Sequence, residues 1–166
     1  SWLGPNDQAL VSLDGQAYIV EVDTKTGRAP KLLSDAEHRQ SAYKASPNGE
    51  KISFVRSGDL YIQDILIKPP QASSNDTNVA TTELRVTWDA SQTINNGLAD
   101  FLAAEEMHRF DGHWWSPCGK YLFYCKVDDG PVAVSYRLEI DADGSKTVAQ
   151  RYPYTGKANP YVCLYS

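Results

Sequence analysis

Residues 46–65 read SPNGEKISFVRSGDLYIQDI and contain the unit that determines how the chain folds. The SPNG segment at 46–49 has the composition of a tight turn, because Pro presets φ and Asn-Gly tolerates positive φ. Residues 51–56 have the character of a strand, residues 57–58 (SG) that of a turn, and residues 59–65 that of a second strand. This pattern predicts a β-hairpin with a further turn directly before it.

The same plan occurs on both sides of this unit. Upstream, an apolar run that ends in Asp-Gly at residues 9–15 is followed by the alternating segment 17–23. Downstream, WSPCG at residues 115–119 precedes the strand-like segment 120–127. Both faces of these segments contain apolar side chains, as expected for sheets that are stacked between neighbouring sheets.

The repeat has a characteristic length. Pro5 and Pro47 are 42 residues apart, and one four-stranded propeller blade takes about 40–45 residues. A β-sandwich also has short strands joined by Gly turns, but it lacks this internal similarity. We therefore predict an all-β fold, a partial β-propeller of two to three four-stranded blades.

The interval from Pro47 to Pro117 is 70 residues and thus longer than one repeat. The excess falls in two places: residues 69–82, rich in Pro, Ser, Asn and Thr, are typical of a loop, and residues 95–111 contain the one helical pattern of the chain. Insertions in repeat folds lie in loops on one face, often the binding face. After residue 117, a strand at 132–140 and a hairpin turn at 143–144 are expected.

The helical insertion begins the stretch NNGLADFLAAEEMHRFDGHWWSP, residues 95–117. We predict a helix that begins near Gly97 and is capped by Asn95 or Asn96. At 100° per residue, one face of this helix is apolar; it comprises Leu98, Phe101 and Leu102. Glu105 then falls in the middle of that face and Glu106 on its flank.

A carboxylate on a buried face costs several kcal/mol, roughly, unless a cation meets it. Either Glu105 has a fixed protein partner, or Glu105 and Glu106 together await a positively charged ligand. A simpler alternative is that both glutamates are solvated surface residues, as adjacent glutamates on a helix most often are. A structural salt bridge is a further alternative.

The segment resembles the double-glutamate region of the dipeptidyl peptidase IV family of serine peptidases. The residues that carry the resemblance are Asn96-Gly97, Phe101, Ala104-Glu105-Glu106-Met107, Arg109, Gly112 and Trp114-Trp115-Ser116-Pro117. A weaker similarity extends over most of the chain, including the YP-turn-NP stretch at 152–160, which we interpret as structural. We interpret the Trp114-Trp115 pair as blade packing rather than ligand contact.

The resemblance implies a function. In that family this segment lies in the N-terminal β-propeller, and its two carboxylates hold the free α-amino group of the peptide substrate. Glu105 and Glu106 are therefore the predicted substrate-binding residues. The resemblance further implies an α/β-hydrolase domain, absent from this chain, that supplies a Ser-Asp-His triad and cleaves after the penultimate residue, favouring Pro or Ala. The family also uses a propeller arginine on the substrate carbonyl; the corresponding stretch here, residues 13–16, contains none, so this role stays unassigned.

The chain itself lacks the catalytic parts of a serine peptidase. It has no G-x-S-x-G motif, and no serine partner is evident for His38, His108 or His113. The spacing of Glu105, His108 and His113 matches no standard metal site. We predict no metal and no cofactor, and expect His108 and His113 to be exposed or hydrogen-bonded near a helix end.

Composition narrows the class of protein. The chain has 166 residues, 42% of them hydrophobic and 22% charged, which is typical of one globular domain. A net charge of −5 without a basic cluster is unlike a nucleic-acid-binding protein. No apolar run reaches the ~20 residues needed to cross a membrane, and no signal peptide is visible. Because the chain starts at Ser1 without Met and stops in a strand-like pattern, we expect an excised fragment.

The cysteines add little. Cys118, Cys125 and Cys163 form no CxxC pair and are odd in number, so neither a zinc site nor a disulfide framework is indicated. Reduced thiols slightly favour a cytoplasmic location. A glycosylation triplet at Asn75 is of a kind that arises readily by chance.

These observations lead to one main hypothesis and two alternatives. The main hypothesis is that residues 1–166 are part of the propeller of a dipeptidyl peptidase IV-type enzyme, inactive alone, with a peptide N-terminus, its own hydrolase domain and a homo-oligomer as partners. The first alternative is a non-catalytic propeller for protein interaction, whose longer chain would contain more blades and no G-x-S-x-G. The second is a prolyl peptidase relative without the exopeptidase restriction.

Overall fold

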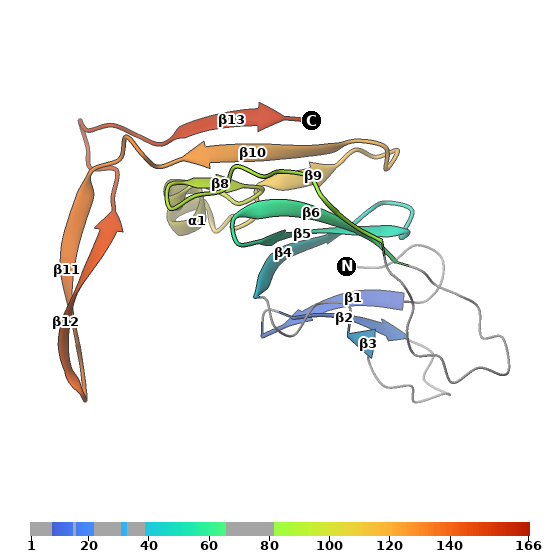
Figure 1. The fold of residues 1–166 in the computed structure, drawn as a ribbon, viewed down its shortest axis with the longest axis horizontal. Coiled ribbons are helices and arrows are strands. Elements are labelled where there is room, and N and C mark those ends of the chain that lie inside the picture. Colours follow the sequence, from blue (N-terminus) through green and yellow to red (C-terminus); the bar gives the residue numbers. More distant parts are fainter. Residues whose placement is uncertain (1–7, 15, 22–30, 33–38, 66–81) are drawn as a thin grey trace, which may run out of the picture.

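The computed structural model describes residues 8–14, 16–21, 31–32, 39–65 and 82–166. In this part of the chain, thirteen strands and one helix form three sheets and a separate two-stranded hairpin. The three sheets lie one above another in chain order, and the hairpin extends away from them (Figure 1). Residues 69–81 of the loop predicted at 69–82, the triplet at Asn75 and the histidine His38 lie outside the described residues.

The first sheet has the order β1-β2-β3, with β1 (Gln8–Leu13), β2 (Gln16–Glu21) and β3 (Lys31–Leu32). All of its pairings are antiparallel, and Leu13 is directly opposite Gln16 across the predicted turn. Asp14 in this turn has φ of 50°, a conformation that Asp and Asn tolerate better than most residues.

The second sheet is a complete four-stranded blade. It contains β4 (Gln40–Ala45), β5 (Lys51–Arg56), β6 (Asp59–Asp64) and β7 (Glu83–Arg85), all antiparallel in the order β4-β5-β6-β7. Both Ser57 and Gly58 have positive φ, 51° and 81°, as the tight hairpin turns that match strand twist require. The predicted hairpin is therefore confirmed.

The core lies between the first two sheets. The first contributes Leu10, Ala17 and Ile19, and the second contributes Ile52, Phe54, Tyr61 and Ile65, all buried. The rings of Phe54 and Tyr61 stack with centroids 5.6 Å apart. Because side chains of facing sheets meet here, the second sheet is apolar on its inner face, as the repeat predicts.

The third sheet is assembled differently. Its central strand is β10 (Leu122–Asp128), which confirms the predicted strand at 120–127. One edge of β10 pairs with β13 (Tyr161–Tyr165), and the other pairs with both β8 (Ile94–Asn96) and β9 (His113–Trp115). The helical insertion lies between β8 and β9 along the chain.

The fourth element is a hairpin of β11 (Val134–Asp141) and β12 (Gly144–Arg151), and it confirms the turn predicted at 143–144. In the earlier repeats, the strand in this position joins the blade; here it leaves the third sheet, and β13 takes its place. Asp129 N donates to Thr93 O, and Pro131, next but one along the chain, has no N–H for a ladder.

The successive antiparallel sheets stacked face to face make this an all-β partial propeller with one helical insertion. Among the described residues, the structure contains no helix with the length and apolar character that a membrane span requires.

Candidate functional site

The insertion leaves and re-enters the third sheet at one point. We call residues 97–112 the helical excursion. At its base, Gly112 N donates to Gly97 O at 2.9 Å, Leu98 and Asp111 form a β-bridge, and Ala99 N donates to Phe110 O at 3.2 Å. The excursion is therefore closed across its base by backbone bonds.

Two glycines allow this close approach. A Cβ at Gly112 would lie 2.2 Å from Leu98 O, which no side chain tolerates. Gly97 has φ of 85°, and a Cβ there would lie 3.0 Å from Leu60 Cδ1. The same glycines bind β10, because Gly97 N donates to Cys125 O and Cys125 N donates to Gly112 O, at 2.8 and 2.7 Å. The base is thus fixed to the central strand of the third sheet.

The helix of the excursion, α1 (Phe101–Met107), begins later than predicted. Its N-cap is Asp100, whose carboxylate accepts from Ala103 N, instead of Asn95 or Asn96. Asn96 is in β8 and fully buried, with its side-chain amide donating to Asp59 and Asp89. The prediction of a start near Gly97 was wrong because residues 97–99 form the closed base, and that backbone geometry is not helical.

The prediction that Glu105 occupies the buried face was also wrong. Ala103 is the buried residue of α1, and Glu105 and Glu106 are both exposed. Glu105 is two positions from Ala103, which corresponds to about 200° around a helix and so to the opposite side. Phe101, the first residue of the short helix, packs edge-on against the ring of Tyr152, with 5.4 Å between centroids.

No hydrogen bond or ion pair within the described part of the chain involves the carboxylate of Glu105 or Glu106. The nearest basic residue in sequence, Arg109, is engaged elsewhere: it donates to Asp111 O at 2.9 Å, pairs with Asp100 at 3.8 Å and lies over the ring of Trp114. The structural salt bridge considered above is therefore not found for the glutamate pair among these residues.

A second cation secures the far side of the base. Lys44 of β4 pairs with Asp111 and lies 5.8 Å from the ring centroid of Trp114, while its carbonyl accepts from Trp115 Nε1 at 3.3 Å. Burial raises the pKa of Asp111, but the hydrogen bond and charge of Lys44 outweigh burial and hold this pKa below its ordinary value. These contacts agree with a packing role for the tryptophan pair.

His108 and His113 both occupy positions that are explained by the fold. His113 is fully buried, and its Nδ1 lies 2.9 Å from Gly97 O; because a carbonyl oxygen can only accept, Nδ1–H is the donor. Burial lowers the pKa of His113 below its ordinary value. His108 ends α1 in the left-handed conformation. No group of three or more His, Cys, Asp or Glu residues that could hold a metal ion occurs in the ranges that the structure describes.

Glu106 lines a pocket of ≈ 570 Å³ between α1 and the base of the hairpin. The other lining residues are Leu102, Ser135, Arg137, Gln150, Tyr152, Pro153, Tyr154 and Thr155. The rings of Tyr152 and Tyr154 are 4.7 Å apart and form one wall. The guanidinium of Arg137 pairs with Glu139 at 2.7 Å. Glu106 therefore lies beside a cavity with aromatic and polar groups.

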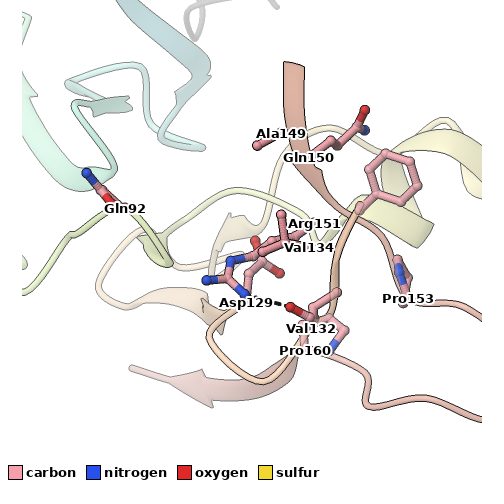
Figure 2. Close-up of a pocket in the computed structure, with 10 residues that line it drawn as sticks. Gln92, Asp129, Val132, Val134, Ala149, Gln150, Arg151, Pro153 and Pro160 are labelled. Atoms are coloured by element: carbon pink, nitrogen blue, oxygen red, sulfur yellow. Dashed lines mark hydrogen bonds between the residues drawn. The ribbon is translucent and has the colours of Figure 1, made fainter. Parts of the chain in front are cut away.

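A second pocket, of ≈ 380 Å³, lies at the hairpin base and is lined by Phe101 among others (Figure 2). Arg151 donates to Val132 O at 2.6 Å and extends toward Asp129. Burial raises the pKa of Asp129, and the charge of Arg151 acts in the opposite direction. These contacts link the end of the hairpin to the segment that connects it with β10, and neither Glu105 nor Glu106 takes part in them.

Sequence reasoning missed Asp59, which contacts Asn96 directly before the excursion, and Lys44, which pairs with Asp111 near its end. No local motif marks either one. An Asp directly after a Ser-Gly turn looks like an ordinary strand start, and a lysine in a strand looks like a surface residue.

The family model for the dipeptidyl peptidase IV (DPP IV) N-terminal region matches residues 6–165. A Schizosaccharomyces pombe protein whose name describes a dipeptidyl aminopeptidase is 30% identical over 161 residues, 90% of this chain and 18% of its own length. Dipeptidyl peptidase 4 of Felis catus is 32% identical over 125 residues, 72% of this chain and 15% of its own length. The chain thus spans less than a fifth of each of these relatives.

Among solved structures, the crystal structure of Porphyromonas gingivalis dipeptidyl peptidase 4 is similar with a TM-score of 0.69. It is 22% identical, and the similarity covers 95% of this chain and 21% of that chain. This likeness confirms the fold.

Proposed function

Because this chain belongs to the dipeptidyl peptidase IV family through its N-terminal region, we propose that it is the substrate-gating propeller part of a serine exopeptidase that releases N-terminal dipeptides. The catalytic α/β-hydrolase domain, with its Ser-Asp-His triad, then belongs to the longer protein. In this proposal the whole of residues 1–166 is part of one propeller domain, and the chain alone is inactive.

Glu105 and Glu106 bind the α-ammonium group of the peptide in this proposal. The observation that carries it is that both carboxylates are exposed and unpaired among the described residues, at the end of a helix whose base is closed by backbone bonds. An ammonium group has three donors and one positive charge, and two carboxylates can accept most of the donors and neutralise the charge. The arrangement offers what a peptide N-terminus needs.

The position of the two glutamates within α1 also favours binding of an ammonium group. Consecutive helix residues point about 100° apart, so the two carboxylates converge only on a ligand that lies between them. The helix ends at Met107, directly after the pair. Unsatisfied carbonyls at a helix C-terminus favour a cation. A bound ammonium within about 4 Å also offsets the mutual repulsion of two neighbouring carboxylates.

An amine fixed in this way acts as a ruler. Only the peptide bond two residues from the anchored N-terminus then reaches a nucleophile that the hydrolase domain supplies. The pair thereby turns binding energy into positioning of the scissile bond.

The test is kinetic and uses the full-length protein. E105Q/E106Q keeps the shape of both side chains and removes both charges, and we expect kcat/KM for a free-amine peptide to fall about 100-fold, equivalent to ~2.7 kcal/mol. E50Q is the matched control, because Glu50 is exposed in a turn of the second sheet. Labelling by a fluorophosphonate, which needs an active-site serine and carries no amine, should be unchanged.

Two outcomes contradict the proposal. Unchanged kcat/KM in E105Q/E106Q removes the ruler and favours the relative without exopeptidase restriction. Absence of any fluorophosphonate labelling of the wild-type protein removes the peptidase itself and favours the propeller used for protein interaction.

A further inference from the structure

Asp59 is a buried carboxylate at the start of β6, with 3% of its side chain exposed. Its Oδ1 accepts hydrogen bonds from Thr87 Oγ1 at 2.8 Å, Asn96 Nδ2 at 3.2 Å and Ala90 N at 3.3 Å. Its Oδ2 accepts from Arg85 Nη2 at 2.5 Å. A buried charge that meets four donors is fully satisfied, and it holds all of them in place.

One of these donors leads to the candidate site. Asn96 is the last residue of β8, and Gly97 after it opens the helical excursion. The Asn96 amide also donates to Asp89 at 2.9 Å, Asp89 pairs with Lys126 of β10, and Asn96 N donates to Gly58 O at 2.8 Å. Asn96 is thus held between the second and third sheets.

The contacts at the base of the excursion are of two kinds: some hold it within the third sheet, and others hold it against the second sheet. The bonds of Gly97 and Gly112 close the excursion on itself and attach it to β10, within the third sheet. Other contacts attach the ends of the excursion to the second sheet. Directly before the start, Asn96 bonds Gly58 O through its N–H and Asp59 through its side chain; near the end, Asp111 pairs with Lys44. The first of these is buried and the second is partly exposed.

We infer that Asp59, through Asn96, is a positioning residue for the Glu105–Glu106 pair, setting the direction in which the excursion presents both carboxylates. The inference rests on the proposed function. Asp59 touches no substrate; it determines where the first residue of the excursion lies relative to the blade beside it.

The substitution D59A removes both acceptor oxygens, so Thr87, Asn96 and Ala90 lose the acceptor that they share. Arg85, whose side chain is 42% exposed, can turn to water instead. The buried Asn96 keeps its contacts with Asp89 and Gly58 O but loses the one with Asp59. Because Asn96 directly precedes Gly97, a shift of Asn96 passes to the first residue of the excursion.

The test is D59A in the full-length protein. We expect KM for a free-amine peptide to rise about tenfold, because misplacement by a fraction of an ångström weakens a two-point anchor, while kcat changes less than about twofold. The rate of inactivation by a fluorophosphonate, which does not use the anchor, should stay unchanged. D64A is the matched control, since Asp64 lies in the same strand and pairs at the surface with Lys51.

The possible outcomes distinguish failure of this inference from failure of the proposed function. Unchanged KM in folded D59A overturns the inference, and so does an equal loss of kcat/KM and of fluorophosphonate reactivity, which indicates general damage. If D59A does not fold, N96S, which removes the reach of the amide to Asp59, is judged by the same measurements. If E105Q/E106Q raises KM and D59A does not, only the inference fails; if E105Q/E106Q has no effect, the proposed function fails.

Discussion

The closed base of the helical excursion makes a direct prediction for Gly112. In G112A the new Cβ would lie 2.2 Å from Leu98 O and 2.5 Å from Leu98 C. Both are backbone atoms, so neither a rotamer change nor a flexible side chain relieves the clash. Ordinary contact requires about 3.5 Å, so the two strands at the base must separate by roughly 1 Å.

This separation weakens the bonds that the base depends on. Gly112 N to Gly97 O and Cys125 N to Gly112 O, 2.9 and 2.7 Å long, both lengthen. Loss of one hydrogen bond costs about 1 kcal/mol, and overpacking adds about 1–3 kcal/mol. We therefore expect G112A to lower the free energy of unfolding by about 3 kcal/mol.

The assay is urea unfolding of the full-length protein, followed by Trp fluorescence because Trp114 and Trp115 adjoin the base. G156A is the control: Gly156 has φ of 77°, but a Cβ there would meet nothing within 4 Å, so this variant carries backbone strain of about 1 kcal/mol and no clash. KM for a free-amine peptide should rise in G112A and not in G156A. Equal stability and KM for G112A and wild type would refute the closed base.

Two further predictions concern protonation and association. Burial lowers the pKa of His113, so the unfolded chain binds a proton at a higher pH than the folded chain does. The free energy of unfolding should therefore decrease as pH falls below about 6.5. H113Q should flatten this part of the curve of stability against pH, and an identical slope in both proteins would contradict the prediction. The homo-oligomer stays a prediction, and we propose that the exposed apolar side chains Tyr136 and Leu138 on one face of β11 form its interface. Y136S/L138S should then sediment as a smaller species, and unchanged sedimentation would remove the hairpin from the interface.

The regular part of the fold could be predicted from the sequence. The SPNG and SG turns with alternating segments between them specify a hairpin locally, and the structure has it at β5 and β6. Local turn chemistry and period-two alternation act over a few residues, so they are visible without knowledge of the rest of the chain.

The course of the third sheet could not be predicted in the same way. β13 pairs with β10 across the whole intervening hairpin, and no local pattern in residues 161–165 distinguishes this partner from β11. Pairing between distant strands depends on which edge is free in the folded sheet, which is a property of the assembled structure.

The candidate site was partly predictable. The identity of Glu105 and Glu106 follows from a specific motif, but their exposure does not, because the helix boundaries decide which residue faces inward. A shift of the start from Gly97 to Phe101 left Ala103, not Glu105, on the buried side. Asp59 and Lys44 act from another sheet, and contacts between sheets leave no spacing signature in the sequence.

If the glutamate pair awaits a peptide ammonium group, a double-mutant cycle on ligand and protein tests this most directly. The measurement is the inhibition constant of a free dipeptide and of its N-acetylated form, for the full-length wild type and for E105Q/E106Q. Acetylation removes the positive charge without shortening the peptide. We predict that acetylation weakens binding to wild type about 100-fold and has almost no effect on binding to E105Q/E106Q. An equal loss on acetylation in both proteins would contradict this prediction, because the amine would then be bound elsewhere.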